Sequence, residues 1–439
     1  MRFYNREREL KKLRELEAAS RRSAKMTVIV GRRRIGKTKL IKEAFDEKVY
    51  LFVSRKSEAL LCEEFVSMIE ATLTRRVLGS FTSFSALFEY LMELSISRPF
   101  TLVIDEFQEF SRVNPALYSE LQRVWDEYKD RARLNLVVSG SIYSLMKRIF
   151  EDKKEPLFGR ADCKLHLKPL SVITLKQLLI EEQGLEDPTQ LNPDDLLSLY
   201  MITGGVAKYV ELLIDAGAFS RQAQLDLIFE PFSLFLDEGK NLLIEELGKE
   251  HTTYFSILSL IASSKTSRSE IESILGRPVG GYLERLEAEY SLIERVRPIL
   301  SKPNGRTLKY RISDPILSFW FRFIDKHKSA IELENYEYVR QLVERDYATY
   351  SGHVLERYFH EQFRLSGAYS ALGNYWERGH QNELDLVAIN ELEKRVVIAE
   401  IKRQAHRINL STLEQKAQKL LTQLKGYEVS YLALSLDDL

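Results

Sequence analysis

The chain has 439 residues, of which 44% are hydrophobic, 29% charged and 10% aromatic, with 20 glycines and 11 prolines. Because this length is about three times a typical domain of roughly 150 residues, it predicts several modules. The composition excludes fibrous, low-complexity and disordered chains. Lysine and arginine number 64, as do aspartate and glutamate, so no net charge draws the whole chain to nucleic acid or to a membrane.

The sequence also bears on the compartment. No stretch approaches the roughly 18 uninterrupted apolar residues of a membrane span, and residues 1–22 lack the apolar core of a signal peptide. Cys62 and Cys163 are the only cysteines, too few for a disulfide framework or a thiolate zinc site. We therefore expect a cytoplasmic protein without a membrane partner.

Three short apolar runs, at 25–30, 100–105 and 134–139, predict the buried strands of a parallel sheet. Helical patterns lie between them, which is typical of an α/β domain. From about residue 176 to residue 236 the chain becomes helical and acidic, and Gly204–Gly205 precede an amphipathic helix. We expect a small helical lid in this segment.

Residues 31–38, GRRRIGKT, fit the phosphate-loop pattern G-x-x-x-x-G-K-[ST] and lie between a predicted strand and a predicted helix. Backbone N–H groups of such a loop wrap the β-phosphate of a nucleotide at the helix N-terminus. Lys37 would reach the β- and γ-phosphates, and Thr38 would hold Mg²⁺. ATP and Mg²⁺ are the expected cofactors, and the nucleotide-binding residues would be Gly31, Arg32, Arg33, Arg34, Ile35, Gly36, Lys37, Thr38 and Lys39. A glycine turn without a ligand is the structural alternative.

Two acidic residues follow the strand at 100–105, at the edge where a parallel sheet presents its ligands. Asp105 would orient the water shell of Mg²⁺, and Glu106 would be the general base that activates a water, which favours hydrolysis. The next strand ends at Ser139, which would contact the γ-phosphate or simply lie in a turn that caps the following helix. Arg160 would stabilise the transition state or form a surface salt bridge.

Together these motifs resemble the archaeal-type P-loop ATPases of the AAA-related STAND group. The resemblance rests on FYNREREL at 3–10, GRRRIGKT, LVIDEFQE, VVSGS, LFGRA, the double glycine and SDPILSFWFRF at 313–323. It implies that Asn5, Arg6 and Glu7 lie near the adenine, that Ser139 is a sensor residue and that Arg160 is a finger residue. It also implies a winged helix and a C-terminal domain similar to restriction endonucleases.

Residues 252–312 predict three helices followed by a hairpin with its turn at Pro303–Gly305, the order of a winged helix-turn-helix. Six basic side chains against one acidic side chain suit phosphate contact by the hairpin: Arg295, Arg297, Lys302, Arg306, Lys309 and Arg311. The third helix carries several glutamates, which is unfavourable for DNA. Double-stranded DNA binding and interdomain packing therefore both stay open for this module.

In the C-terminal region, Asp385 and the pair Glu400 and Lys402 lie on two runs joined by a short turn, which predicts adjacent antiparallel strands. Period-two alternation places Glu400 and Lys402 on one face, where the hairpin brings Asp385 beside them. Two carboxylates and a lysine suit a Mg²⁺-dependent phosphodiesterase, with Asp385 and Glu400 as metal ligands. Glu356, on the preceding helix, would complete the cluster. The pattern resembles the PD-(D/E)xK fold, and a salt-bridge cluster without catalysis is the alternative.

The predicted fold class is α/β, a P-loop NTPase of the ASCE or AAA-like type with three further modules. The predicted domains are an ATPase core at 1–175, a helical lid at 176–236, a winged helix-turn-helix at 237–328 and a nuclease-like domain at 329–439. The leading hypothesis is an ATPase that controls a DNA-associated and nucleolytic domain. Its rival is a non-nucleolytic signalling ATPase whose last two modules bind a protein partner. A homo-oligomer is compatible with either hypothesis.

Overall fold

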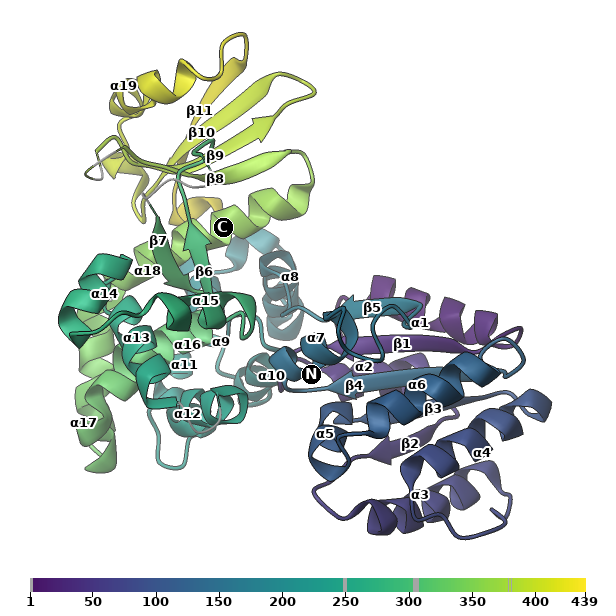
Figure 1. Ribbon diagram of the computed structural model, residues 1–439. Helices are drawn as coiled ribbons and strands as arrows, with labels where there is room; N and C mark the ends of the chain where they lie inside the picture. The colour runs from purple at the N-terminus through teal and green to yellow at the C-terminus, as the bar shows by residue number, and fades with distance from the viewer. Residues whose placement is uncertain (1–2, 248–250, 303–307, 378, 380) are drawn as a thin grey trace. The chain divides into compact units, whose positions relative to one another are not determined.

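The structure is a computed structural model that describes residues 3–247, 251–302, 308–377, 379 and 381–439 (Figure 1). It divides into two compact units. The first is Phe3–Lys168, and the second contains Pro169–Leu439.

The first unit has a five-stranded parallel sheet in the order β2-β3-β4-β1-β5. The predicted parallel α/β sheet is thereby confirmed. Its strands are β1 (Lys25–Val30), β2 (Val49–Phe52), β3 (Phe100–Asp105), β4 (Leu134–Gly140) and β5 (Cys163–His166). The helices are α1 (Glu7–Ser20), α2 (Lys37–Ala44), α3 (Glu58–Leu73), α4 (Phe84–Ser97), α5 (Phe110–Val113), α6 (Leu117–Tyr128) and α7 (Tyr143–Glu151).

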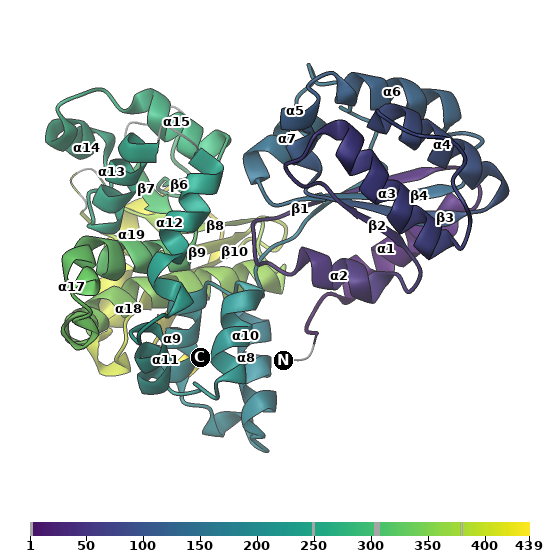
Figure 2. The same ribbon diagram turned by 90° about the horizontal axis from the view of Figure 1, so that it is seen from below.

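Helices cover both faces of this sheet, as Figures 1 and 2 show. Successive strand residues point to opposite faces. Val28 and Leu136 therefore join the core beneath α3, α4 and α6, whereas Ile29 and Val137 join the core beneath α1 and α2. Because both faces are buried, the strands read as continuous apolar runs in the sequence.

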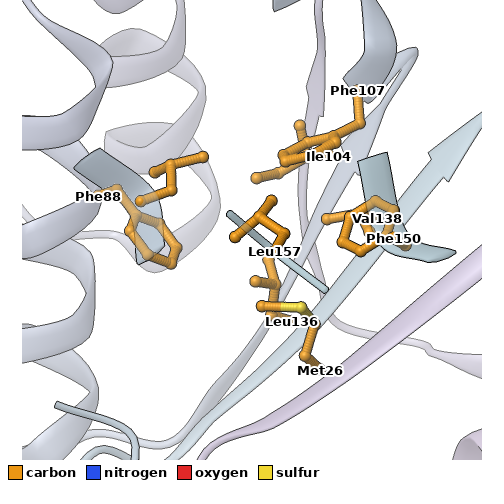
Figure 3. Close-up of a pocket in the computed structure, with 9 residues that line it drawn as sticks. Met26, Phe88, Ile104, Phe107, Leu136, Val138, Phe150 and Leu157 are labelled. Atoms are coloured by element: carbon orange, nitrogen blue, oxygen red, sulfur yellow. The ribbon is translucent and has the colours of Figure 1, made fainter. Parts of the chain in front are cut away.

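Figure 3 shows side chains converging on a small void in the first of these cores, among them Phe88, Phe107 and Leu157. Its volume is about 10 Å³, and every residue around it is apolar. A void of that size and lining has room for at most one water and offers no polar partner. We therefore assign it to packing and not to a ligand site.

The second unit begins with helices α8 (Val172–Gln183), α9 (Pro193–Thr203), α10 (Ala207–Asp215) and α11 (Arg221–Ile228), which gather in one group (Figure 2). The side chains of Ser171 and Asn192 cap the first two helices. Gly184 and Gly204 end them in the left-handed conformation, which glycine adopts without strain. Helix α12 spans Leu234–Leu247.

Three helices and an antiparallel strand pair then follow in the predicted order. They are α13 (His251–Ala262), α14 (Arg268–Leu275), α15 (Gly280–Ala288), β6 (Ile293–Val296) and β7 (Lys309–Ile312). The predicted turn at Pro303–Gly305 and the basic residue Arg306 lie outside the described residues. Short helices α16 (Pro315–Phe319) and α17 (Lys328–Glu332) lead on from the pair.

The C-terminal part consists of the long helix α18 (Tyr336–Ser366), a four-stranded sheet and α19 (Leu410–Leu421). The sheet order is β11-β10-β9-β8, from β8 (Ala371–Tyr375), β9 (Leu384–Asn390), β10 (Arg395–Ile401) and β11 (Glu428–Leu434). Strands β9 and β10 are antiparallel, as predicted, and β10 pairs with β11 in parallel. Within the described part of the chain, no helix combines the length and the apolar character that crossing a bilayer requires.

Candidate nucleotide-binding site and C-terminal ion-pair cluster

The phosphate loop connects the end of β1 to the start of α2, the setting that the sequence predicted. Gly36 has φ 99° and Arg34 has φ 67°, so the loop turns through two left-handed residues. A side chain at Gly31 would come within 3.1 Å of the Leu167 carbonyl, so this position accepts only glycine without a shift. Lys37 is 8% exposed, and its Nζ donates to the carbonyls of Gly31 at 2.6 Å and Arg32 at 3.0 Å.

The other loop residues differ in exposure. Ile35 is 4% exposed and packs in the core below α2. Arg33 and Thr38 are exposed, and the intermediate positions are Arg32, Arg34 and Lys39. The loop thus presents several cations and one hydroxyl at the carboxyl edge of the sheet, where an anionic ligand would lie.

Asp105 ends β3 and is 6% exposed. Its Oδ1 accepts hydrogen bonds from the Ser139 hydroxyl and, at 3.0 Å, from the backbone N–H of Glu106. Its Oδ2 accepts a hydrogen bond from the Tyr50 hydroxyl. In this structure Ser139, which is fully buried, therefore orients the carboxylate of Asp105.

Glu106 follows with φ 55°, a left-handed conformation that a residue with a side chain seldom adopts. Its Oε2 accepts hydrogen bonds from Gln108 Nε2 at 2.5 Å, from the Ser141 hydroxyl at 2.7 Å and from the Ser141 N–H at 3.3 Å. Two adjacent carboxylates are thus held by two separate sets of donors. A strained backbone kept in place by several contacts is a common feature of functional sites.

Tyr50, on β2, is a site residue that the sequence reasoning missed. Burial raises the pKa of its hydroxyl, and the hydrogen bond to Asp105 raises it further, while a hydrogen bond with the Thr38 side chain lowers it. Tyr50 therefore connects the two side chains predicted to serve Mg²⁺. A hydroxyl in an otherwise apolar strand was the available signal, but the pattern of a buried strand does not reveal its neighbour.

The predicted adenine-side residues lie at the start of α1. Arg6 is 8% exposed, and it donates to the Lys168 carbonyl at 2.6 Å and pairs with Glu9 at 3.2 Å. Burial lowers the pKa of its guanidinium, and Glu9 opposes that effect. Asn5 is exposed with φ 49°, and Glu7 is also exposed.

Arg160 forms a surface ion pair, which is the second of the two roles that the sequence predicted for it. Its Nη2 lies 2.7 Å from Asp126 Oδ2, and its Nη1 donates to the carbonyl of Pro156 at 2.6 Å. In the part of the chain that the structure describes, the side-chain hydrogen bonds of Arg160 go to Asp126, Pro156 and Phe158 and not to Asp105 or Glu106. Its role as a transition-state cation stays a prediction.

In the C-terminal sheet, Lys402 joins the two predicted carboxylates. Its Nζ lies 2.9 Å from Asp385 Oδ2 and 3.1 Å from Glu400 Oε1. Burial lowers the pKa of Lys402, but the charges and hydrogen bonds of Asp385 and Glu400 outweigh it, so the net shift is upward. The backbone N–H of Ile401 donates to Asp385 Oδ2 at 2.8 Å, and Lys416 Nζ lies 3.3 Å from Glu400.

Glu356 does not join these residues in a metal-binding group. Among the described residues no three or more His, Cys, Asp or Glu side chains are placed to hold a metal ion. Burial raises the pKa of Glu356, and its carboxylate contacts His353 of the same helix at 3.7 Å. The three carboxylates therefore do not form one metal-binding group, whereas the role of Glu356 beside Asp385 and Lys402, whose charges act on it, stays a prediction.

Comparison with known proteins gives the class. Residues 3–213 match an ATPase domain predominantly from Archaea, and residues 320–419 match a family of archaeal and bacterial proteins of unknown function. An uncharacterized protein of Methanocaldococcus jannaschii is 29% identical over 412 residues, covering 91% of this chain and 87% of that protein.

Two solved structures are similar to the chain, and the first of them, with a TM-score above 0.5, shares its fold. A Walker-type ATPase of Pyrococcus abyssi is similar with a TM-score of 0.53 and 22% identity, over 73% of this chain and 96% of that chain. The ORC2 protein of Aeropyrum pernix has a TM-score of 0.48 and 15% identity, over 78% of this chain and 96% of that chain.

The parallel sheet, the phosphate loop and the paired acids at the sheet edge define a nucleotide-binding P-loop ATPase. More particularly, the chain is similar to archaeal-type P-loop ATPases: residues 3–213 match the ATPase domain found predominantly in Archaea, and residues 320–419 match the domain of unknown function.

Proposed function

We propose that this ATPase is a switch that hydrolyses ATP with Mg²⁺ and thereby controls a DNA-processing C-terminal domain. The observation that carries the hydrolytic part is the separate fixing of Asp105 and Glu106 at the edge of the sheet. One carboxylate is then available to the metal shell and the other to the attacking water, as hydrolysis requires.

The residues fit a Mg²⁺ ion. Asp105 accepts three hydrogen bonds from neutral donors, and Thr38, an exposed residue, offers a hydroxyl. Oxygen ligands of this kind are those that Mg²⁺ prefers. When bound, the ion would neutralise charge on the phosphates. Lys37 would exchange its two loop carbonyls for phosphate oxygens, and Glu106 would accept the proton of the attacking water.

Contacts within the second unit support coupling between the helical group and the C-terminal domain. Glu361, on α18, accepts hydrogen bonds from the N–H of Val172 at 3.3 Å and from the Tyr200 hydroxyl at 3.0 Å. Arg403 Nη2 lies 2.8 Å from Asp194 at the start of α9. A nucleotide-dependent shift of α8 and α9 would therefore carry the C-terminal domain with it.

The proposed chemistry of the C-terminal domain is Mg²⁺-dependent cleavage of a phosphodiester. It is supported by Lys402, which contacts both Asp385 and Glu400 on adjacent strands. Asp385 and Glu400 would hold the metal ion, and Lys402 would orient the water. Double-stranded DNA, reached through the module at 252–312 and the C-terminal domain, is the proposed partner.

Nicking of supercoiled plasmid in Mg²⁺ or Mn²⁺ tests this proposal. Lys402→Ala should abolish nicking, because it removes the cation shared by both carboxylates. Lys419→Ala is the matched control, since Lys419 pairs with Glu377 at 2.8 Å in the same domain. Equal nicking by both variants, or cleavage of neither plasmid nor a single strand by the parent chain, would overturn the nuclease part of the proposal.

A second function, a non-nucleolytic signalling ATPase, is favoured by the pairing of the hairpin cations. Arg295 pairs with Glu287, and Arg311 Nε lies 2.8 Å from Glu294, so neither is free of a carboxylate as a DNA-binding hairpin would prefer. In that case the hairpin and the C-terminal domain bind a protein partner or a second copy. An intact ATPase cycle without plasmid nicking or DNA binding is its signature.

A further inference from the structure

A cleft of about 560 Å³ lies within the second unit, between the β6–β7 pair and the C-terminal domain. Asp385, Lys402 and Glu356 line it from the C-terminal side, and Lys309 and Arg311 line it from β7. Two of the proposed cleavage residues, Asp385 and Lys402, thus face a second wall, which β7 forms. Pockets of about 300–1,000 Å³ hold ligands of the size of a small molecule or a nucleotide.

Several contacts fix the strand pair as this wall. Lys309 Nζ lies 2.9 Å from Glu383 and 4.7 Å from the centre of the Trp376 ring. Beyond β6, the N–H of Ile299 donates to the Asn374 carbonyl at 2.8 Å. Arg357 Nη1, on α18, donates to the Ile312 carbonyl at 3.0 Å. Because the strand pair is held in this position, a ligand can approach Asp385 and Lys402 only through the cleft.

The lining favours an anionic ligand with hydrogen-bond acceptors. Its basic residues are Lys309, Arg311, Arg322, Arg357 and Lys402, and its acidic residues are Glu356, Glu383 and Asp385. Trp376 lines the cleft and is 3% exposed, and its indole N–H has no hydrogen-bond partner among the described residues. A buried donor without an acceptor is destabilising, and an acceptor atom of a ligand that reached it would relieve this cost.

We propose that this cleft takes a nucleotide unit of a single DNA strand, at an end, a gap or a flap, and excludes a continuous duplex. A specific duplex interface covers about 1,000–2,500 Å² of open protein surface, whereas this cleft has the volume for one or two unstacked nucleotides. The inference deepens the proposed function and rests on it, because it names the substrate class of the same C-terminal residues. The Lys309–Glu383 ion pair holds β7 against the C-terminal domain and so keeps a duplex out of the cleft; we call this ion pair the latch.

Fluorescence anisotropy of the full chain in EDTA, without ATP, tests the substrate class while no cleavage takes place. The probes are a labelled oligothymidine strand and a blunt duplex of the same length. We expect the strand to bind about tenfold tighter than the duplex, a difference of roughly 1.4 kcal/mol. For the single strand, Arg311→Gln should make the slope of log affinity against log salt concentration less steep by about 0.7, which is the value for one lost phosphate contact. Arg295→Gln, on the same strand pair but outside the cleft lining, should leave the slope unchanged.

The latch is tested by charge reversal. Lys309→Glu should reduce the preference for the strand, because repulsion from Glu383 releases the wall, and adding Glu383→Lys should restore it. Restoration also shows that the single variant had folded. Equal binding of strand and duplex by the parent, or binding of neither, would overturn the inference. Strand preference without cleavage of the labelled strand in Mg²⁺ or Mn²⁺ would contradict the nuclease proposal alone, whereas duplex nicking without strand preference would contradict this inference alone.

Discussion

The substitution Ser139→Ala tests whether Ser139 orients the Asp105 carboxylate in the absence of nucleotide or serves only to contact the γ-phosphate of bound nucleotide. The Ser139 side chain is 0% exposed and donates to Asp105, which is itself 6% exposed. A hydrogen bond to a charged group contributes about 1.5–3 kcal/mol, more than a neutral one, and the substitution leaves almost no cavity. Asp105 keeps its bonds from Tyr50 and from the Glu106 N–H, so the first unit should still fold.

For a unit of this size, 1 kcal/mol corresponds to a shift of about 2–4 °C, so Ser139→Ala should lower the melting temperature by about 3–12 °C. The measurement is calorimetry of the full chain without nucleotide. Thr27→Val is the matched control: Thr27 is also 0% exposed, on the adjacent strand β1, but its hydroxyl has no hydrogen-bond partner among the described residues. Removing an unpaired buried hydroxyl should be neutral or stabilising. A Ser139→Ala chain as stable as Thr27→Val would refute the orienting role.

Two further results are expected. Tyr50→Phe removes the hydroxyl that is hydrogen-bonded to Asp105 Oδ2 and to Thr38, so both become available to the metal ion. The Mg²⁺ concentration for half-maximal ATP binding, measured by metal titration, should therefore fall about tenfold. An increase in that concentration would mean that Tyr50 positions the metal ligands instead. Glu356→Gln should stabilise the chain relative to the parent increasingly as the pH rises above the ordinary carboxyl value of about 4.3. Burial raises the folded-state pKa of Glu356, so the folded chain binds more protons than the unfolded chain and stability falls as pH increases through that pKa. Melting temperatures of both chains from pH 4 to 8 check this, and parallel profiles would contradict it.

Local pattern was sufficient for the elements of the site. The motif GRRRIGKT between a strand and a helix predicted the phosphate loop. Asp105 and Glu106, at the end of the apolar run 100–105, were predicted to lie at the same edge of the sheet, because parallel strands align their carboxyl ends. Alternation likewise predicted that Lys402 and Glu400 share a face, and the ion pairs to Asp385 and Glu400 follow from it.

What the sequence could not predict depends on contacts between distant segments. Tyr50 reaches Asp105 only because β2 pairs with β3, and no periodicity specifies which strands are neighbours. Arg160 was predicted with two roles because its partner, Asp126, lies on α6, which is distant in the sequence. Lys309 was expected to contact phosphate, whereas in the structure it pairs with Glu383 across 74 residues of sequence separation. Side-chain partners of this kind are fixed by tertiary packing and not by local pattern.

Single-turnover hydrolysis of Mg²⁺-ATP by Glu106→Gln, measured beside equilibrium ATP binding, tests the central claim most directly. The glutamine keeps an oxygen that can accept from Ser141 but lacks the basicity to take a proton, so binding should match the parent while hydrolysis slows about 10²–10⁴-fold. Lys37→Ala should instead lose binding, because its ammonium group would contact the phosphates. Hydrolysis at the parental rate in Glu106→Gln, or loss of ATP binding equal to that of Lys37→Ala, would contradict the assignment of Glu106 as the base.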